Sequence, residues 1–132
     1  MAAGIAMTGA GAGELRLVMF ERDGCIYCAR WHEQIGPAYP DTAEGAAAPL
    51  LQLDIKAPLP DGMTLIGGPP AITPTFVLTD DGAEVARMAG YPGDEFFWVL
   101  LDDMLEQAGW TDPAAPPQQG GTLPAPAPPP AN

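Results

Sequence analysis

The stretch VMFERDGCIYCARWHEQIGP, residues 18–37, joins an apolar run to an amphipathic run through a short charged turn. The apolar run from Glu14 to Phe20 predicts a buried strand. From Cys25 to Ile35, apolar side chains recur at helical spacing and Gly36-Pro37 follows, which predicts a helix that ends there. Both cysteines of the chain are therefore expected at the start of a helix that follows a strand.

The placement of Cys25 and Cys28 favours redox chemistry. A disulfide across so short a separation closes almost no loop, so it would stabilise the fold little. A metal site of thiolates would need further ligands, and His32 is the only soft candidate. At the first turn of a helix, free backbone N–H groups and the helix dipole favour a thiolate, so we expect Cys25 to be the nucleophile. Cys28, one turn later, can attack the mixed disulfide as the resolving thiol.

The rest of the chain predicts an α/β fold. Further strands are predicted at residues 50–55, 74–79 and 84–89. The last two flank Asp80-Asp81-Gly82, and an Asp-Gly step between apolar runs is a strong hairpin signal. Irregular connections are expected at residues 37–49 and 56–72, and a final helix, capped by Asp94, ends at Gly109. The predicted architecture is a mixed four-stranded sheet flanked by helices.

Composition divides the chain into three parts. Residues 14–110 are expected to form one folded domain, near the lower end of ordinary domain sizes. Residues 111–132 are dominated by Pro and Ala, with Gly and Gln. Such a segment has little to bury, which predicts a disordered tail. Residues 1–13 are small and apolar without a helical or alternating pattern, so we expect either a flexible leader or the remnant of an export signal.

The net charge of the 132-residue chain is -12, from seventeen acidic and five basic residues. A surface of this kind repels phosphate backbones, so nucleic acid is not an expected partner. No stretch approaches the ~20 apolar residues that a membrane span needs, so we do not expect the chain to be membrane-embedded. The glycines at residues 9–13 lack the spacing of a dinucleotide loop, and no cofactor is predicted.

Thr73-Pro74 is a second candidate part of the site. X-Pro bonds adopt the cis form at modest cost, and a proline opening a strand withholds no donor that the sheet needs. An ordinary trans proline is the alternative for an isolated Pro, but the cysteine pair upstream favours cis. Tyr27 lies inside the cysteine motif at a helix start, where we expect it to be exposed and able to contact a partner.

These segments carry a family resemblance. LRLVMFERDGCIYC, TPTFVLTDDG and RMAGYPGDEFFWVLL resemble the thioredoxin superfamily, in which the proline before the hairpin is cis and faces the cysteine pair. More narrowly, GCIYCARWHEQIGPAYP, LQLDI and FFWVLL are similar to the SoxS-type periplasmic thioredoxins of the bacterial sulfur-oxidation (Sox) system. The resemblance covers Glu14 to Leu105.

The resemblance implies a periplasmic reductase that keeps the Sox sulfur-carrier protein active by reducing disulfides or adducts at its carrier cysteine. Electrons would come from a membrane transporter of the CcdA type. Carried over to this sequence, Cys25 is the nucleophile, Cys28 is the resolving cysteine, and Thr73-Pro74 is the peptide-facing cis-proline segment. The chain departs from cytosolic thioredoxins at Met19, where those proteins have a buried Asp. Proton transfer at Cys28 would then use water or another carboxylate.

Several interpretations stay open at this stage. Glu21 and Glu33 are both conceivable proton-handling carboxylates. His32, four residues after Cys28, either stabilises a thiolate as an imidazolium or is a partly exposed surface histidine. Alternative functions are a periplasmic disulfide oxidase or isomerase, a cytochrome-maturation reductase, and a metal chaperone that uses Cys25, Cys28 and His32 as ligands.

Overall fold

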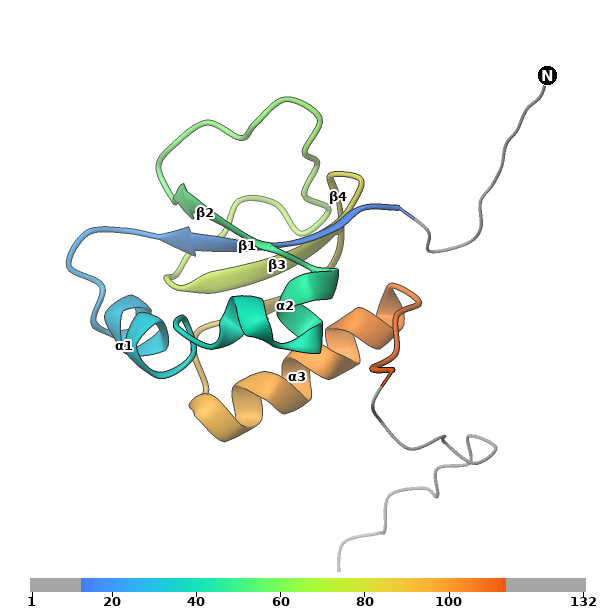
Figure 1. Ribbon diagram of the computed structural model, residues 1–132. Coiled ribbons are helices and arrows are strands. Elements are labelled where there is room, and N and C mark those ends of the chain that lie inside the picture. The colour runs from blue at the N-terminus through green and yellow to red at the C-terminus, as the bar shows by residue number, and fades with distance from the viewer. Residues whose placement is uncertain (1–12, 114–132) are drawn as a thin grey trace, which may run out of the picture.

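The strands form one mixed sheet in the order β2-β1-β3-β4 (Figure 1). The computed structural model describes residues 13–113. In chain order its elements are β1 (Leu15–Glu21), α1 (Ile26–Gln34), the short 3-10 helix η1 (Tyr39–Asp41), α2 (Ala43–Ala47), β2 (Leu50–Asp54), β3 (Thr75–Asp80), β4 (Ala83–Ala89) and α3 (Asp94–Gln107). Apart from their inner ends, the expected leader at residues 1–13 and the expected tail at residues 111–132 lie outside the described residues.

The sheet confirms the predicted α/β architecture. β1 pairs with β2 in parallel and with β3 in antiparallel, and β3 and β4 form a hairpin. Asp81 and Gly82 turn the hairpin with φ of 52° and 89°, the left-handed backbone that an Asp-Gly step favours. β1 and β3 are buried along most of their length, which explains why both are apolar runs rather than alternating ones. Their bounds differ from the predicted ones by about one residue.

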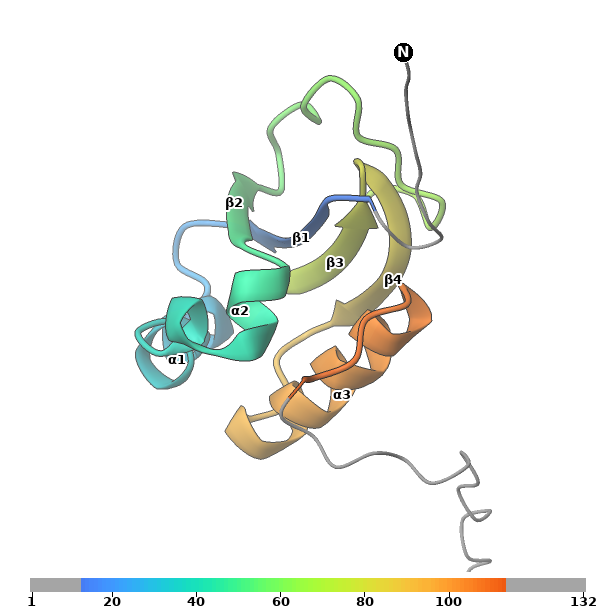
Figure 2. The same cartoon turned by 45° about the vertical axis from the view of Figure 1, so that its right-hand side comes forward.

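Helices cover one face of the sheet and the β2–β3 connection covers the other (Figures 1 and 2). On the helix face, Leu17, Met19, Phe76 and Leu78 of the two central strands belong to the same buried cluster as the inner side chains of α1 and α3. On the opposite face, a smaller cluster is formed by Val18, Phe20 and Val77, against which Leu51, Leu53, Ile55, Met63 and Leu65 pack. The main hydrophobic core therefore lies on the side of the sheet that holds α1.

Trp31 of α1 lies at the centre of this core, with no exposed surface. Its ring centroid is 5.5 Å from that of Phe76, 5.8 Å from Phe97 and 6.0 Å from Tyr39. These contacts link α1 to the sheet, to α3 and to η1. Aromatic pairs contribute stabilising free energy beyond that of their buried area. This cluster therefore holds α1, which carries both cysteines, in a fixed position.

The prediction that residues 37–49 are irregular is wrong, because η1 and α2 lie there. Thr42 accepts a hydrogen bond from the backbone N–H of Gly45 at 2.9 Å, as the N-cap of α2. The buried Tyr39 donates its hydroxyl to the carbonyl of Ala48 at 2.7 Å. A side-chain cap and one buried aromatic thus stabilise a five-residue helix that helix propensity alone does not predict.

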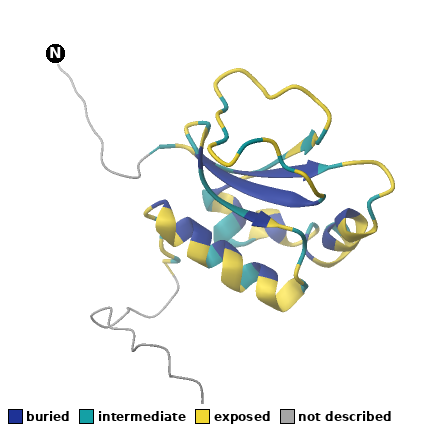
Figure 3. Ribbon diagram, turned by 180° about the vertical axis from the view of Figure 1, so that it is seen from behind, coloured by how far each residue is buried: buried dark blue, intermediate teal, exposed yellow. Residues whose placement is uncertain are grey.

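The start of α3 also differs from the prediction. Gly93, not Asp94, is the N-cap of α3, with φ of 108°. Asp94 is instead the first helical residue, where its charge still favours the positive end of the helix dipole. The inner face of α3 is buried and its outer face is exposed (Figure 3), and Phe96, Val99 and Leu100 are among the exposed residues.

Arg87 and Glu84 anchor the β2–β3 connection to β4. Arg87 donates Nε and Nη2 to the two carboxylate oxygens of Glu84, at 2.7 and 2.8 Å. Nη2 also donates to the carbonyl of Gly68 at 2.8 Å, and Glu84 accepts from the N–H of Gly67 at 2.9 Å. The hydrogen bond from Arg87 lowers the pKa of Glu84, so the buried carboxylate is held in its charged form.

Candidate active site

Cys25 and Cys28 are joined by a disulfide at the start of α1, with their Cα atoms 5.2 Å apart. Cys25 is the N-cap of the helix, and its Sγ accepts a hydrogen bond from the backbone N–H of Cys28 at 3.1 Å. Cys25 is partly exposed, whereas Cys28 is 4% exposed. The sulfur that a partner can reach is therefore also the sulfur at the positive end of the helix dipole.

The turn between β1 and α1 sets the position of Cys25. The strand ends at Glu21, and the backbone N–H of Cys25 donates to the carbonyl of Arg22 at 3.3 Å. Gly24 has a φ of 79°, a left-handed conformation that glycine adopts without steric cost. Since β1 lies inside the sheet, this tight turn places the cysteines directly beyond the end of a rigid strand.

Thr73-Pro74 lies at the same end of the sheet as the cysteine turn. The Thr73–Pro74 peptide bond is cis. Thr75, the next residue, is the register partner of Phe20, which is one residue from the end of β1. The carbonyl of Pro74 accepts from the N–H of Gly90 at 2.7 Å, which ties this segment to the end of β4. Sheet register therefore places at one end of the sheet two motifs that are almost fifty residues apart in the sequence.

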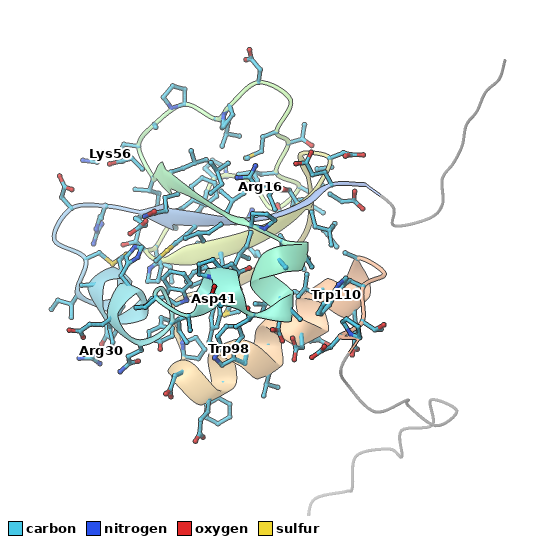
Figure 4. The ribbon with its side chains drawn as sticks, in the orientation of Figure 1. Arg16, Arg30, Asp41, Lys56, Trp98 and Trp110 are labelled. Carbon is cyan, nitrogen blue, oxygen red and sulfur yellow. A yellow bond between two sulfur atoms is a disulfide. The ribbon has the colours of Figure 1, made fainter. Side chains whose placement is uncertain are left out.

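Exposed apolar side chains flank both motifs. Ile26 is 67% exposed and Tyr27 55% exposed beside the disulfide, and Ile72 is 49% exposed beside Thr73. Arg30, which projects from the outer side of α1 (Figure 4), has its guanidinium carbon 5.7 Å from the centroid of the Tyr27 ring. Tyr27 is thus exposed, as its place in the motif led us to expect, and a charged neighbour lies over its ring.

A pocket of about 440 Å³ opens beside the two cysteines, between the end of β1 and α1. Its charged and titratable lining comes from Glu21, Arg22, Asp23 and His32. His32 Nε2 lies 2.8 Å from Glu21 Oε1, and Gln52 of β2 donates to Glu21 Oε2 at 2.9 Å. The side chain of His32 is 37% exposed and that of Glu21 is 19% exposed.

Sequence reasoning missed the pairing of His32 with Glu21 and the contact with Gln52. The helical spacing of Cys28 and His32 indicates a shared face, but it does not say which way the ring turns. The sequence feature that points to Glu21 is its position at the end of the apolar run, immediately before the cysteine turn. Glu33, the other carboxylate considered, is exposed on α1 and does not line the pocket.

A separate acidic contact lies between α2 and α3, outside the lining of this pocket. Burial, followed by a hydrogen bond and charge repulsion from Glu44, raises the pKa of Asp102 to about 7. Burial also raises the pKa of Tyr39 well above its usual range. Within residues 13–113, no cluster of three or more His, Cys, Asp and Glu side chains is arranged to hold a metal ion. Over the same range, no helix is long and apolar enough to cross a membrane.

Comparison with known proteins finds matches among solved structures. A scan against models of protein families and a search of curated proteins found no match. Among solved structures, the reduced form of the periplasmic thioredoxin SoxS from Paracoccus pantotrophus is 52% identical, with a TM-score of 0.70, over 72% of this chain and 99% of that chain.

More distant structures agree on the fold. A thioredoxin-fold protein from Helicobacter pylori is 19% identical with a TM-score of 0.55, over 71% of this chain and 70% of that chain. Fasciola hepatica thioredoxin is 19% identical with a TM-score of 0.50, over 68% of this chain and 81% of that chain. With a cysteine pair at a helix start and 52% identity to SoxS over nearly all of that protein, the chain belongs to the thioredoxin superfamily, among its SoxS-type thiol–disulfide oxidoreductases.

Proposed function

We propose that this chain reduces disulfides or thiol adducts on the sulfur-carrier protein of a bacterial sulfur-oxidation system, and that it does so in the periplasm. The observation that carries the proposal is the 52% identity with the periplasmic thioredoxin SoxS over 99% of that protein. The oxidised pair must be reduced again after each turnover, and the similarity to SoxS-type thioredoxins supports a membrane transporter of the CcdA type as the proposed electron donor.

In the proposed reaction, Cys25 attacks the partner and Cys28 resolves the mixed disulfide. The greater exposure of Cys25 and its place as the N-cap of α1 support its role as the nucleophile. The Cys28 N–H, which already donates to Cys25 Sγ, would donate more strongly to a thiolate. Cys28 is buried one turn further along, so an incoming partner meets Cys25 first.

The surface around the disulfide favours a cysteine on an exposed, flexible segment of the partner. The backbone of Thr73 beside Pro74 can pair with an extended peptide, and Tyr27 and Ile72 offer exposed apolar contacts. An attacking sulfur must reach its target in line, so a buried disulfide is a poor substrate. The net charge of -12 favours a partner with a neutral or basic face.

Trapping tests the partner. The Cys28→Ser variant should hold its partner as a mixed disulfide, because the resolving thiol is missing, and the Cys25→Ser variant should capture nothing. Both variants are incubated with a periplasmic extract, and the captured proteins are identified by mass spectrometry. Recovery of the sulfur carrier supports the proposal. Capture dominated by folding enzymes or by cytochrome-maturation proteins would replace it with an oxidase, isomerase or cytochrome-maturation role.

A further inference from the structure

Cys28 has to lose a proton before it can resolve a mixed disulfide, since the thiolate is the attacking species. The side chain is 4% exposed, so bulk water has little access to it. On the same face of the sheet, Met19 is fully buried in the cluster that contains Cys28, and a thioether cannot take up a proton at neutral pH. The proton must therefore leave toward the pocket that both cysteines line.

The pocket holds a hydrogen-bonded base on that route. His32 lies one helical turn beyond Cys28, and both residues line the pocket. A carboxylate only accepts hydrogen bonds, so the contact with Glu21 Oε1 places the imidazole proton on Nε2 and leaves Nδ1 as the basic atom of the neutral ring. Gln52 holds the other oxygen of Glu21, which keeps the carboxylate oriented toward the ring.

We propose that His32, oriented by Glu21, accepts the proton of Cys28 through water in this pocket. Glu21 is a positioning residue, because it sets the tautomer of the ring and stabilises the imidazolium that forms. The inference rests on the proposed roles of Cys25 and Cys28, and it is independent of which partner the protein serves. Cytosolic thioredoxins have a buried Asp at the position of Met19. In this chain, His32 would serve as the proton acceptor instead.

The step balances as follows. A partner thiol R–SH is released from the mixed disulfide Cys25–S–S–R when the sulfur of Cys28 bonds to the sulfur of Cys25 and the bond from Cys25 to R–S breaks. The proton of Cys28 passes through water to Nδ1 of His32, and the leaving R–S⁻ takes a proton from the imidazolium or from solvent. Cys25 and Cys28 end oxidised as the disulfide, and the partner ends reduced.

Other charged residues line this pocket and an adjoining one. Arg22 and Asp23, from the turn between β1 and α1, line this pocket. Asp54, at the end of β2, lines an adjoining pocket together with Glu21, Arg22, Asp23 and Gln52. Arg22, Asp23 and Asp54 stay as they are in every variant chosen below.

The test isolates the resolving step with Ellman's reagent, 5,5′-dithiobis(2-nitrobenzoate). Reduced protein is loaded in mild acid, where Cys25 reacts and Cys28 stays protonated, and is then mixed into buffers of increasing pH. Absorbance of released thionitrobenzoate reports the attack of Cys28. General-base assistance is worth about 10²–10⁴-fold in rate, so we expect Glu21→Gln and His32→Ala each to slow this release about tenfold or more near neutral pH.

Two further readouts separate proton transfer from a structural role. The difference from wild type should fade as the pH rises, because Cys28 then ionises without a base, and free imidazole should restore the rate of the His32→Ala variant. The matched control is Glu33→Gln, which removes the same charge from an exposed site on α1 and should leave the rate unchanged. Thermal unfolding of each variant shows that it is folded.

Three results would overturn the inference. The first is an unchanged rate of the second release in Glu21→Gln and His32→Ala. The second is a slowing that is equal at all pH values and is not restored by imidazole. The third is that only the first release, from Cys25, slows. If instead Cys25→Ser releases thionitrobenzoate faster than Cys28→Ser, the cysteine assignment itself fails, and that outcome is distinguishable because it appears without any Glu21 or His32 variant.

Discussion

Replacing Met19 with Asp would put a carboxyl group into the main core beneath the cysteine pair. Met19 has no exposed surface and belongs to the same buried cluster as Cys28 and Trp31. Its register partners are Phe76 on β3 and Gln52 on β2. The amide nitrogen of Gln52 already donates to Glu21, so the side chain of this register partner is engaged elsewhere.

The expected loss of folding stability in Met19→Asp has two contributions. Losing the buried methionine side chain costs about 2 kcal/mol or more, by comparison with other large-to-small changes in cores. Burying a carboxyl without a full set of hydrogen bonds adds about 2–3 kcal/mol. We therefore expect Met19→Asp to lower the free energy of unfolding by roughly 4–5 kcal/mol at pH 7, a large part of the stability of a domain of this size.

Urea unfolding of the oxidised protein at pH 5 and pH 7 measures this effect. Burial raises the folded-state pKa of the new carboxyl above its unfolded value of about 4, so stability falls as the pH rises from there toward the folded pKa. The loss should therefore be smaller at pH 5 than at pH 7. Met19→Leu, which conserves volume, is the control and should cost under about 1.5 kcal/mol. If the Asp variant matched the Leu variant at pH 7, the description of this position as a dry core site would be refuted.

Two further predictions concern stability. Asp102 has a folded pKa of about 7, raised by burial and by Glu44 from its model-compound value, so stability falls as the pH rises between about 4 and 7. Asp102→Asn should therefore stabilise the protein at pH 8 by on the order of 1 kcal/mol after allowance for solvent screening, with the gain lost by about pH 4, as thermal unfolding across that range would show. Arg87→Met should cost about 2–4 kcal/mol in urea unfolding because it leaves the buried Glu84 without its opposite charge, and a loss below about 1 kcal/mol would mean that the pair does not anchor the connection.

The sheet, α1 and the hairpin could be predicted because each has a strong local signal. β1 and β3 are apolar runs between turn residues, and Asp81-Gly82 is a favoured hairpin turn. α2 has no such signal, since Pro40 and Gly45 interrupt the stretch and its main stabilising contacts involve Thr42 and the buried Tyr39. Tertiary packing, which no local pattern reports, decides that segment.

The site shows the same limit. The chemistry of Cys25 and Cys28 follows from their spacing and from the helix that they begin, so the sequence alone indicates it. The neighbourhood of His32 depends on how the end of β1 faces α1 and on the parallel register that brings Gln52 beside Glu21. These are contacts between elements, and they arise only once the sheet has formed.

The β2–β3 connection gives the two faces of the sheet unequal resistance to local opening. Ile55, Met63 and Leu65 of this connection pack against the smaller cluster. Otherwise residues 55–74 are held by a few turn hydrogen bonds, by one isolated bridge between Thr64 and Ala83, and by the contacts of Glu84 and Arg87. The helix face is instead joined through the aromatic rings around Trp31. Amide protons of the connection should therefore exchange with solvent through small, frequent openings, while those of β1 and of α1 beyond its first turn exchange only when the whole domain unfolds. The disulfide thus lies in the half of the molecule that stays closed during local openings of the other half.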